Sequence, residues 1–229
     1  LDNLSATYAD GCLYVAGGKG KPQTVPIGKD GSQTAPTNPL FSLQLTPSLQ
    51  KEWVRLPDFP GPARVQPVLT AQQSEDGIRL YLAGGFQPAS AHQEAIVCTD
   101  MLSYHPKTKQ WRNEGFLPSL AGGSHRTVTG GCAIASGDSS ILLVGGVNYD
   151  RFRDALNHPE PDYLLHPADW YKFNTSLLQY NTFTKHWTHL GNYEELARAG
   201  AGIANNANTV IIIGGELKPG IRTPEVNAF

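Results

Sequence analysis

Four short apolar runs, each closed by two glycines, recur along the chain and predict four equivalent β-strands. They read CLYVAGG, RLYLAGG, ILLVGG and VIIIGG, and their second glycines are Gly18, Gly85, Gly146 and Gly215. The intervals between these glycines are 67, 61 and 69 residues. An aliphatic run of this length followed by a glycine pair is typical of a buried strand that ends in a tight turn. Its recurrence indicates a repeat fold.

A second pattern, in which a strand meets a polar turn and then a tryptophan, lies after each of the first three runs. It reads LFSLQLTPSLQKEW, MLSYHPKTKQW and LLQYNTFTKHW, and it ends at Trp53, Trp111 and Trp187. The turn residues before each tryptophan predict a hairpin between a third and a fourth strand. A double glycine followed by tyrosine and tryptophan is the signature of a kelch repeat. We therefore predict an all-β fold, a kelch-type β-propeller, in which RFRDALN is the one segment with a helical period.

The repeats divide a single domain into blades. We predict blades over 1–60, 61–118 and 119–195, the last with a long insertion at 147–176, and a half blade over 196–229. Blades stack radially, and their ring normally closes on itself. Because about three and a half blades are fewer than a closed propeller usually has, we expect the chain to form part of a larger ring.

Polar residues flank the first two strands of each predicted blade and are expected to meet at one mouth of the central channel. The start of the first strand lies beside the end of its antiparallel neighbour. Basic residues in these places and one carboxylate predict a site for an anionic polar ligand. The alternative is that the arginines pair with carboxylates or cap carbonyl groups between blades. The residues before the first strands are Arg64, His125, Arg126 and Arg198, and those after the second strands are Lys19, Gln87, Asn148 and Glu216.

Two long loops differ in composition. The insertion over 147–176 holds six aromatic residues, which argue against disorder. We expect it either to wall a pocket or to pack on the neighbouring blade. The loop over 18–39 has no aromatic residue and is rich in Gly, Pro and Thr, so we predict that it is flexible.

Composition and net charge limit the kinds of partner that the chain is expected to bind. With 229 residues, 40% of them hydrophobic, the chain is long enough to bury a substantial core. A formal net charge of -2 predicts no nucleic-acid or membrane partner, and no apolar stretch approaches the roughly 20 residues of a membrane helix. The chain begins at Leu1, which suggests a removed signal peptide or a longer protein. Cys12, Cys98 and Cys132 lack metal-site spacing and are predicted to be buried thiols.

The segment GGELKPGIRT, at 214–223, resembles the GGE-x-KPG-x-RT stretch of N-acetylneuraminate epimerases, also called sialic acid mutarotases. FPGPAR, PKTKQW, GGVNYDRF and FNTSLLQYNTFTKHW are similar to family segments in the same order, so the likeness covers most of the chain. Members are six-bladed kelch propellers that interconvert sialic acid anomers, and one branch is cyclically permuted. The resemblance implies a six-bladed ring and a periplasmic or secreted location.

The same resemblance implies roles for particular residues. Glu216 corresponds to the family's proton acceptor and Arg222 to the partner of the substrate carboxylate, while Arg64 and Asn148 match further pocket positions. The implied activity is that of a sugar isomerase, which opens and recloses the ring of a sugar acid by acid/base chemistry. No metal or organic cofactor is expected. The channel argument adds His125, Arg126 and Arg198 as substrate-binding candidates.

Three other interpretations remain open at this point. Glu216 can form a salt bridge with Lys218 or Arg222 that has no part in chemistry. A kelch propeller can also be a non-catalytic module that binds a protein or a glycan through its rim loops. A copper-radical oxidase is disfavoured, because it needs a second histidine at a position equivalent to His125, and the sequence has none there.

Overall fold

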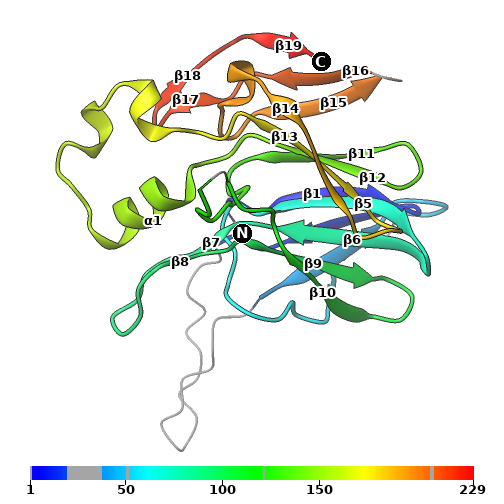
Figure 1. The fold of residues 1–229 in the computed structure, drawn as a ribbon. Helices are drawn as coiled ribbons and strands as arrows, with labels where there is room; N and C mark the ends of the chain where they lie inside the picture. The colour runs from blue at the N-terminus through cyan, green and yellow to red at the C-terminus, as the bar shows by residue number, and fades with distance from the viewer. Residues whose placement is uncertain (1, 20–37, 50–51, 121, 207–208) are drawn as a thin grey trace, which may run out of the picture.

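Four antiparallel sheets follow one another along the chain in the computed structural model, which describes residues 2–19, 38–49, 52–120, 122–206 and 209–229 (Figure 1). Within each sheet the strands are hydrogen-bonded in the order in which the chain reaches them. The first sheet holds β1 (Ser5–Ala9), β2 (Cys12–Ala16), β3 (Leu40–Gln44) and β4 (Val54–Leu56). The second holds β5 (Val68–Ser74), β6 (Gly77–Ala83), β9 (Asp100–His105) and β10 (Gln110–Phe116).

The third and fourth sheets continue the series towards the C-terminus. The third holds β11 (Cys132–Ser136), β12 (Ser140–Val144), β13 (Ser176–Asn181) and β14 (Trp187–Asn192). The fourth holds β15 (Gly202–Asn206), β16 (Thr209–Ile213) and β19 (Val226–Ala228). Two small hairpins join the strands: β7 (Phe86–Gln87) with β8 (Ile96–Val97), and β17 (Glu216–Lys218) with β18 (Ile221–Arg222). The described residues therefore form four blades of a β-propeller, and the fourth blade has three described strands where the sequence predicted only half a blade.

The four glycine-closed apolar runs form β2, β6, β12 and β16, the second strands of the four sheets, as predicted. Each pairs with an antiparallel strand on both sides. In β6 and β12 almost every side chain is buried, because the faces of the sheet pack against the neighbouring blades. A strand covered in this way reads as an uninterrupted hydrophobic run, which is why the sequence revealed it.

The tyrosine and tryptophan of the second repeated pattern form cross-strand pairs between the third and fourth strands. Tyr104 lies opposite Trp111, and Tyr180 lies opposite Trp187. Their ring centroids are 5.1 Å and 4.8 Å apart, and both pairs are tilted by 47°. Each pair packs into the apolar core between two blades. The spacing of Tyr and Trp in the sequence thus follows from the register of a hairpin, and the two rings that this register pairs fill the junction between two blades.

The first glycine of the first three pairs is required by the approach of the next blade. A Cβ on Gly84 would lie 2.9 Å from the backbone nitrogen of Thr129, and one on Gly145 would lie 2.6 Å from the carbonyl oxygen of Arg198. Both glycines also have positive φ, at 60° and 66°. Backbone of one blade therefore touches backbone of the next at this point, and a side chain would separate them.

Four residues at the entrances to the first strands of successive blades are joined in a row and are here called the inner ring: Asn3, Gln66, Gly130 and Gly200. All four have left-handed backbone conformations. The N–H of Gln66 donates to the carbonyl of Asn3 (2.9 Å), that of Gly130 to Gln66 (3.0 Å), and that of Gly200 to Gly130 (2.7 Å). The inner ring thus links the four blades by a chain of backbone hydrogen bonds.

The insertion between β12 and β13 is ordered around a helix and an aromatic cluster. Helix α1 (Tyr149–Asn157) contains the predicted helical segment, and two 3-10 helices follow it in the insertion, at Tyr163–Leu165 and Ala168–Tyr171. A third 3-10 helix, Glu194–Leu196, lies after β14. The insertion packs on the second blade, where Phe152 meets Phe86 edge-on at 5.1 Å and Asn157 hydrogen-bonds the backbone of Ala95. Most of the loop predicted to be flexible, 20–37, lies outside the described residues.

The three cysteines are unpaired, and two of them are buried. Burial raises the pKa of the Cys98 and Cys132 thiols to about 11, so both are held as neutral thiols. Cys12 is half-buried and donates to Oε1 of Gln44 at 3.0 Å. Among the described residues, no helix has the length and apolar character needed to cross a membrane.

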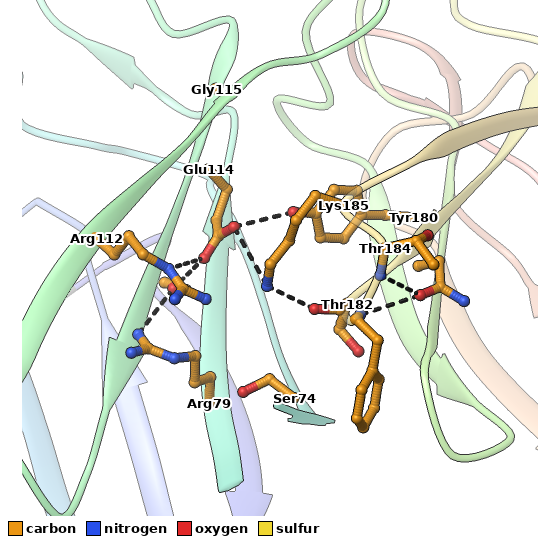
Figure 2. A network of polar contacts seen from close by, with 12 residues as sticks. Ser74, Arg79, Arg112, Glu114, Gly115, Tyr180, Thr182, Thr184 and Lys185 are labelled. Carbon is orange, nitrogen blue, oxygen red and sulfur yellow. Dashed lines mark hydrogen bonds and ion pairs between the residues drawn. The ribbon is translucent and has the colours of Figure 1, made fainter. Parts of the chain in front are cut away.

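A buried carboxylate joins the second and third blades. Glu114, whose side chain is 3% exposed, is the extra residue of a β-bulge in β10. The bulge turns the Glu114 side chain towards three hydrogen-bond donors (Figure 2). These are Ser103 Oγ (2.6 Å), Arg112 Nε (2.8 Å) and Tyr180 Oη (2.9 Å). Lys185 of the third blade lies 3.7 Å away. Burial alone would raise the pKa of Glu114, but these hydrogen bonds and the charge of Lys185 lower it below its usual value.

Replacing Glu114 with glutamine is expected to lower the free energy of unfolding at pH 7 by about 2–3 kcal/mol, because Arg112 and Lys185 lose a buried carboxylate. A pKa lowered by folding means that this carboxylate stabilises the fold above its unfolded pKa and ceases to do so as the pH falls through the folded pKa. The difference between wild type and variant should therefore shrink between pH 7 and pH 3 in urea titrations. The exposed Glu94→Gln in the same blade is the control. A difference that is constant with pH would contradict the assignment.

Candidate active site

A short hairpin holds the two residues of the GGELKPGIRT segment that were predicted to carry the chemistry. Glu216 begins β17 and Arg222 ends β18, and the two residues are direct partners across the hairpin. Gly220, at φ 79°, makes the turn between the strands. As a result, Nε of Arg222 donates to Oε1 of Glu216 at 3.3 Å. The spacing of six residues in the sequence is thus the spacing of one cross-strand pair.

The hairpin is fixed to the propeller and to the insertion. The N–H of Glu216 donates to the carbonyl of Ala199 at 2.7 Å, and the N–H of Ala199 donates back at 3.0 Å. Lys218 donates through Nζ to the carbonyls of Leu164 (3.1 Å) and His166 (2.6 Å) in the insertion. Because Lys218 is occupied there, the carboxylate of Glu216 pairs with Arg222 instead.

Glu216 and Arg222 line a cavity of about 560 Å³ that lies over the inner ring. The Glu216 side chain is 31% exposed and that of Arg222 is 81% exposed. Only Nε of Arg222 takes part in the pair, and no hydrogen bond among the described residues uses its two terminal nitrogens or Oε2 of Glu216. One carboxylate oxygen and the guanidinium fork are therefore available to a ligand. The lining also includes all four inner-ring residues, Asn3, Gln66, Gly130 and Gly200, with Leu4, Ser5, Pro67, Gly131, Ala199 and Gly215.

Arg64 and Arg198 occupy equivalent places in the second and fourth blades, and both are buried in ion pairs. Two nitrogens of the Arg64 guanidinium bind the carboxylate of Asp100 (2.8 Å) and the carbonyl of Gly84 (3.0 Å). Its side chain is fully buried. These contacts tie the entrance of the blade to the end of its second strand and the start of its third.

Arg198 repeats this arrangement. It binds Oε2 of Glu225 at 2.8 Å and the carbonyl of Gly214 at 3.2 Å. The alternative considered for the channel arginines was that they pair with carboxylates or cap carbonyl groups between blades. Both arginines do pair with a carboxylate and cap a carbonyl, but these partners lie within the same blade. Their predicted contact with substrate stays a prediction, and it would have to compete with these bonds.

The third blade has no arginine at the equivalent position. Backbone contacts show that the equivalent residue in the third blade is Val128, not Arg126 or His125. The glycine of the preceding blade identifies it, because Gly84 packs against Val128 in the same way as Gly145 packs against Arg198. The amide of Asn174 takes over the bond to the glycine carbonyl, donating to Gly145 at 3.1 Å. A basic residue near the same sequence position was therefore an unreliable guide to structural equivalence.

The remaining channel candidates lie away from the cavity of Glu216. Arg126 is buried, which lowers its pKa, and it donates to the carbonyl of Pro118 at 3.0 Å. The exposed His125 packs edge-on against Tyr149, with ring centroids 5.1 Å apart. Asn148 is the N-cap of α1 and accepts from the N–H of Arg151. The structure thus brings together Glu216 and Arg222, and it leaves these three elsewhere.

Asn148 lines a second cavity, of about 700 Å³, which the insertion walls. Asp169, Lys172 and Phe173 of the insertion line it, as does Leu217 of the β17–β18 hairpin. Both expectations for the insertion therefore hold: it packs on a neighbouring blade and it walls a pocket. The residue of the third blade that is equivalent to Glu216 is Val147, because its N–H donates to the carbonyl of Thr129 as that of Glu216 donates to Ala199. Asn148 therefore lies one position beyond the residue that corresponds to Glu216.

Among the described residues, Glu160, Asp162 and His166 place possible metal-ligand atoms within 4.8 Å of one another. The two carboxylates are exposed. The imidazole of His166 stacks on Trp170 at 3.8 Å, and this contact explains its position. The group lies on the insertion, apart from the cavity of Glu216.

Sequence reasoning missed the inner ring, and with it Asn3 and Gln66 as cavity residues. Neither belongs to a repeated motif, since the equivalent positions of the other blades are glycines. The one available signal was their place: each lies two residues before the first residue of a first strand, Ser5 or Val68. Their conformation and their approach to Glu216 became visible only in the assembled propeller.

The fold and the cavity define a class of protein: a kelch-type β-propeller that carries a carboxylate and a guanidinium group in a cavity lined by the inner ring. The family model described as N-acetylneuraminate epimerase matches residues 16–229. The chain therefore belongs to the N-acetylneuraminate epimerase family.

Individual relatives agree with this assignment. The chain is 27% identical over 215 residues to the N-acetylneuraminate epimerase of Pasteurella multocida (strain Pm70), a match that covers 88% of this chain and 52% of the relative. It is 29% identical over 237 residues to that of Haemophilus influenzae (strain PittEE), covering 96% and 58%. The chain spans about half the length of the curated relatives it matches. A solved structure, described as "Structure of YjhT", has a TM-score of 0.71 at 24% identity, covers 98% of this chain and 60% of that one, and supports the fold.

Proposed function

We propose that this protein is a sugar isomerase that interconverts the anomers of N-acetylneuraminic acid or a closely related sugar acid. The observation that carries the proposal is the pair of Glu216 and Arg222, 3.3 Å apart in a cavity lined by the inner ring. Membership of the N-acetylneuraminate epimerase family supports it. A small-molecule sugar acid is then the partner of this cavity, and we also propose the periplasmic or secreted location that the family resemblance implied.

The reaction requires one proton to leave the sugar and another to enter it. The carboxylate of Glu216 takes the proton of the anomeric hydroxyl, while an acid or a water molecule protonates the ring oxygen and the bond from that oxygen to the anomeric carbon breaks. The exposed carbonyl then turns over. The hydroxyl formed from the ring oxygen attacks the other face and returns its proton to the acid or water, the carbonyl oxygen recovers the proton held by Glu216, and the ring closes as the other anomer.

Arg222 is suited to hold the substrate in place. Sialic acid carries a carboxylate beside its anomeric carbon, and a guanidinium fork binds a carboxylate through two parallel hydrogen bonds. The terminal nitrogens of Arg222 are available for this, while its Nε stays with Glu216. One residue thus connects the substrate carboxylate to the base, which sets the anomeric hydroxyl near Glu216.

The test is saturation-transfer NMR on N-acetylneuraminic acid with catalytic amounts of the full-length protein. Anomer exchange well above the rate without protein is the expected result. Exchange at the rate of the protein-free solution would overturn the proposal and favour the non-catalytic propeller that binds through its rim loops.

Replacing Arg222 with lysine should weaken binding of N-acetylneuraminic acid by about tenfold, because the charge remains but the bidentate fork is lost. Binding of a neutral N-acetylated sugar should not change. Calorimetric titration of both sugars measures the effect. Arg55→Lys is the matched control, since Arg55 is exposed and pairs with Asp58 on the first blade. An equal loss of affinity for both sugars would show that Arg222 does not bind the carboxylate.

A further inference from the structure

The inner ring contains one residue that its backbone conformation disfavours. The left-handed region suits glycine and tolerates asparagine, and the ring has Gly130, Gly200 and Asn3 at three of its places. The fourth is Gln66, with φ 54°. A longer side chain there costs stability that glycine would avoid. Such strain tends to persist where the side chain serves a function.

The backbone of Gln66 is held on both sides, but its side chain is not. The N–H donates to Asn3 and the carbonyl accepts from Gly130. The side chain is exposed, and the hydrogen bonds of the described residues include none to its carboxamide. Gln66 therefore keeps the chain in its conformation while offering one acceptor and two donors to the cavity.

Gln66 lines the same cavity as Glu216 and Arg222. Its Oε1 would lie 3.8 Å from a Cβ placed on Gly130, so the side chain leans towards the next blade. A Cβ on Gly200 would meet nothing within 4 Å. Neither glycine has a side chain to fill the cavity that both line together with Gln66, Glu216 and Arg222.

We propose that Gln66 is a substrate-binding residue, whose carboxamide hydrogen-bonds the hydroxyl or acylamino groups of the sugar acid while Arg222 and Glu216 hold its carboxylate and anomeric centre. This inference rests on the proposed function. The carboxamide can donate and accept hydrogen bonds at the same time, and the hydroxyl and acylamino groups of the sugar acid can do so too. Gln66 then orients the part of the sugar that does not react.

The experiment is to replace Gln66 with glycine in the full-length protein and to measure two quantities, the melting temperature and the affinity for N-acetylneuraminic acid by calorimetry. Glycine relieves the left-handed conformation, so the melting temperature should equal or exceed that of wild type. The affinity should fall about tenfold, the effect of losing good hydrogen bonds to a ligand. A structural role alone would not give these two changes together.

Lys109→Gly is the matched control, because Lys109 is an exposed residue with φ 58° at the tip of the β9–β10 hairpin. It should share the effect on the melting temperature and leave the affinity unchanged. If wild type binds the sugar and Gln66→Gly binds it equally well, the inference is wrong and the proposed function stands. If wild type neither binds N-acetylneuraminic acid nor exchanges its anomers, the proposed function is wrong and the role of Gln66 fails with it.

Discussion

Replacing Glu216 with glutamine is expected to slow the anomer exchange of N-acetylneuraminic acid by at least about 10²-fold, with little change in sugar affinity. Glutamine keeps the size of the side chain and an acceptor oxygen for Nε of Arg222, but it cannot take a proton at neutral pH. Loss of a general base typically costs a factor of 10² to 10⁴. Saturation-transfer NMR measures the exchange, and calorimetric titration measures the affinity.

The surroundings of Glu216 separate this effect from loss of the fold. Its pair with the largely exposed Arg222 contributes little to stability, so Glu216→Gln should unfold at the wild-type temperature. Glu195→Gln, at an exposed glutamate of a 3-10 helix, is the control and should leave exchange unchanged. Full exchange by Glu216→Gln would place the base elsewhere and remove the role assigned to this residue from the family resemblance.

Replacing Gly84 with alanine is expected to lower the free energy of unfolding by about 3 kcal/mol or more. Two costs combine at this position. A left-handed backbone disfavours any Cβ by about 1–2 kcal/mol, and this Cβ would also lie 2.9 Å from the backbone nitrogen of Thr129. Since the contact is with backbone, relief requires the second and third blades to move apart. Urea unfolding of the variant measures the loss.

Gly137→Ala distinguishes the two costs. Gly137 has φ 56°, close to the 60° of Gly84, but a Cβ there would meet nothing within 4 Å. We expect a loss of about 1–2 kcal/mol, the conformational cost alone. Equal losses in the two variants would mean that the close approach of the blades adds nothing and that the double glycine serves only the turn.

Much of the fold could be read from the sequence, because the interactions that produce it are local. The second strands are apolar along their length since they are buried on both faces, and the glycine pairs mark where one backbone must touch another. Tyr104 and Trp111 reveal a hairpin because cross-strand partners lie at a fixed spacing. Glu216 and Arg222 were found through the family resemblance of the GGELKPGIRT segment, and the structure shows that they are partners across one short hairpin.

The tertiary structure alone decided what the other polar residues do. Arg64 and Arg198 looked like ligands for an anion, but each is bound to a carboxylate, Asp100 or Glu225, that lies 36 or 27 residues further along the chain. Gln66 drew no attention in the sequence, although it lines the same cavity as Glu216. The composition of a strand reports its burial, but the partner of a buried charge and the lining of a cavity depend on which distant segments the packed blades bring into contact.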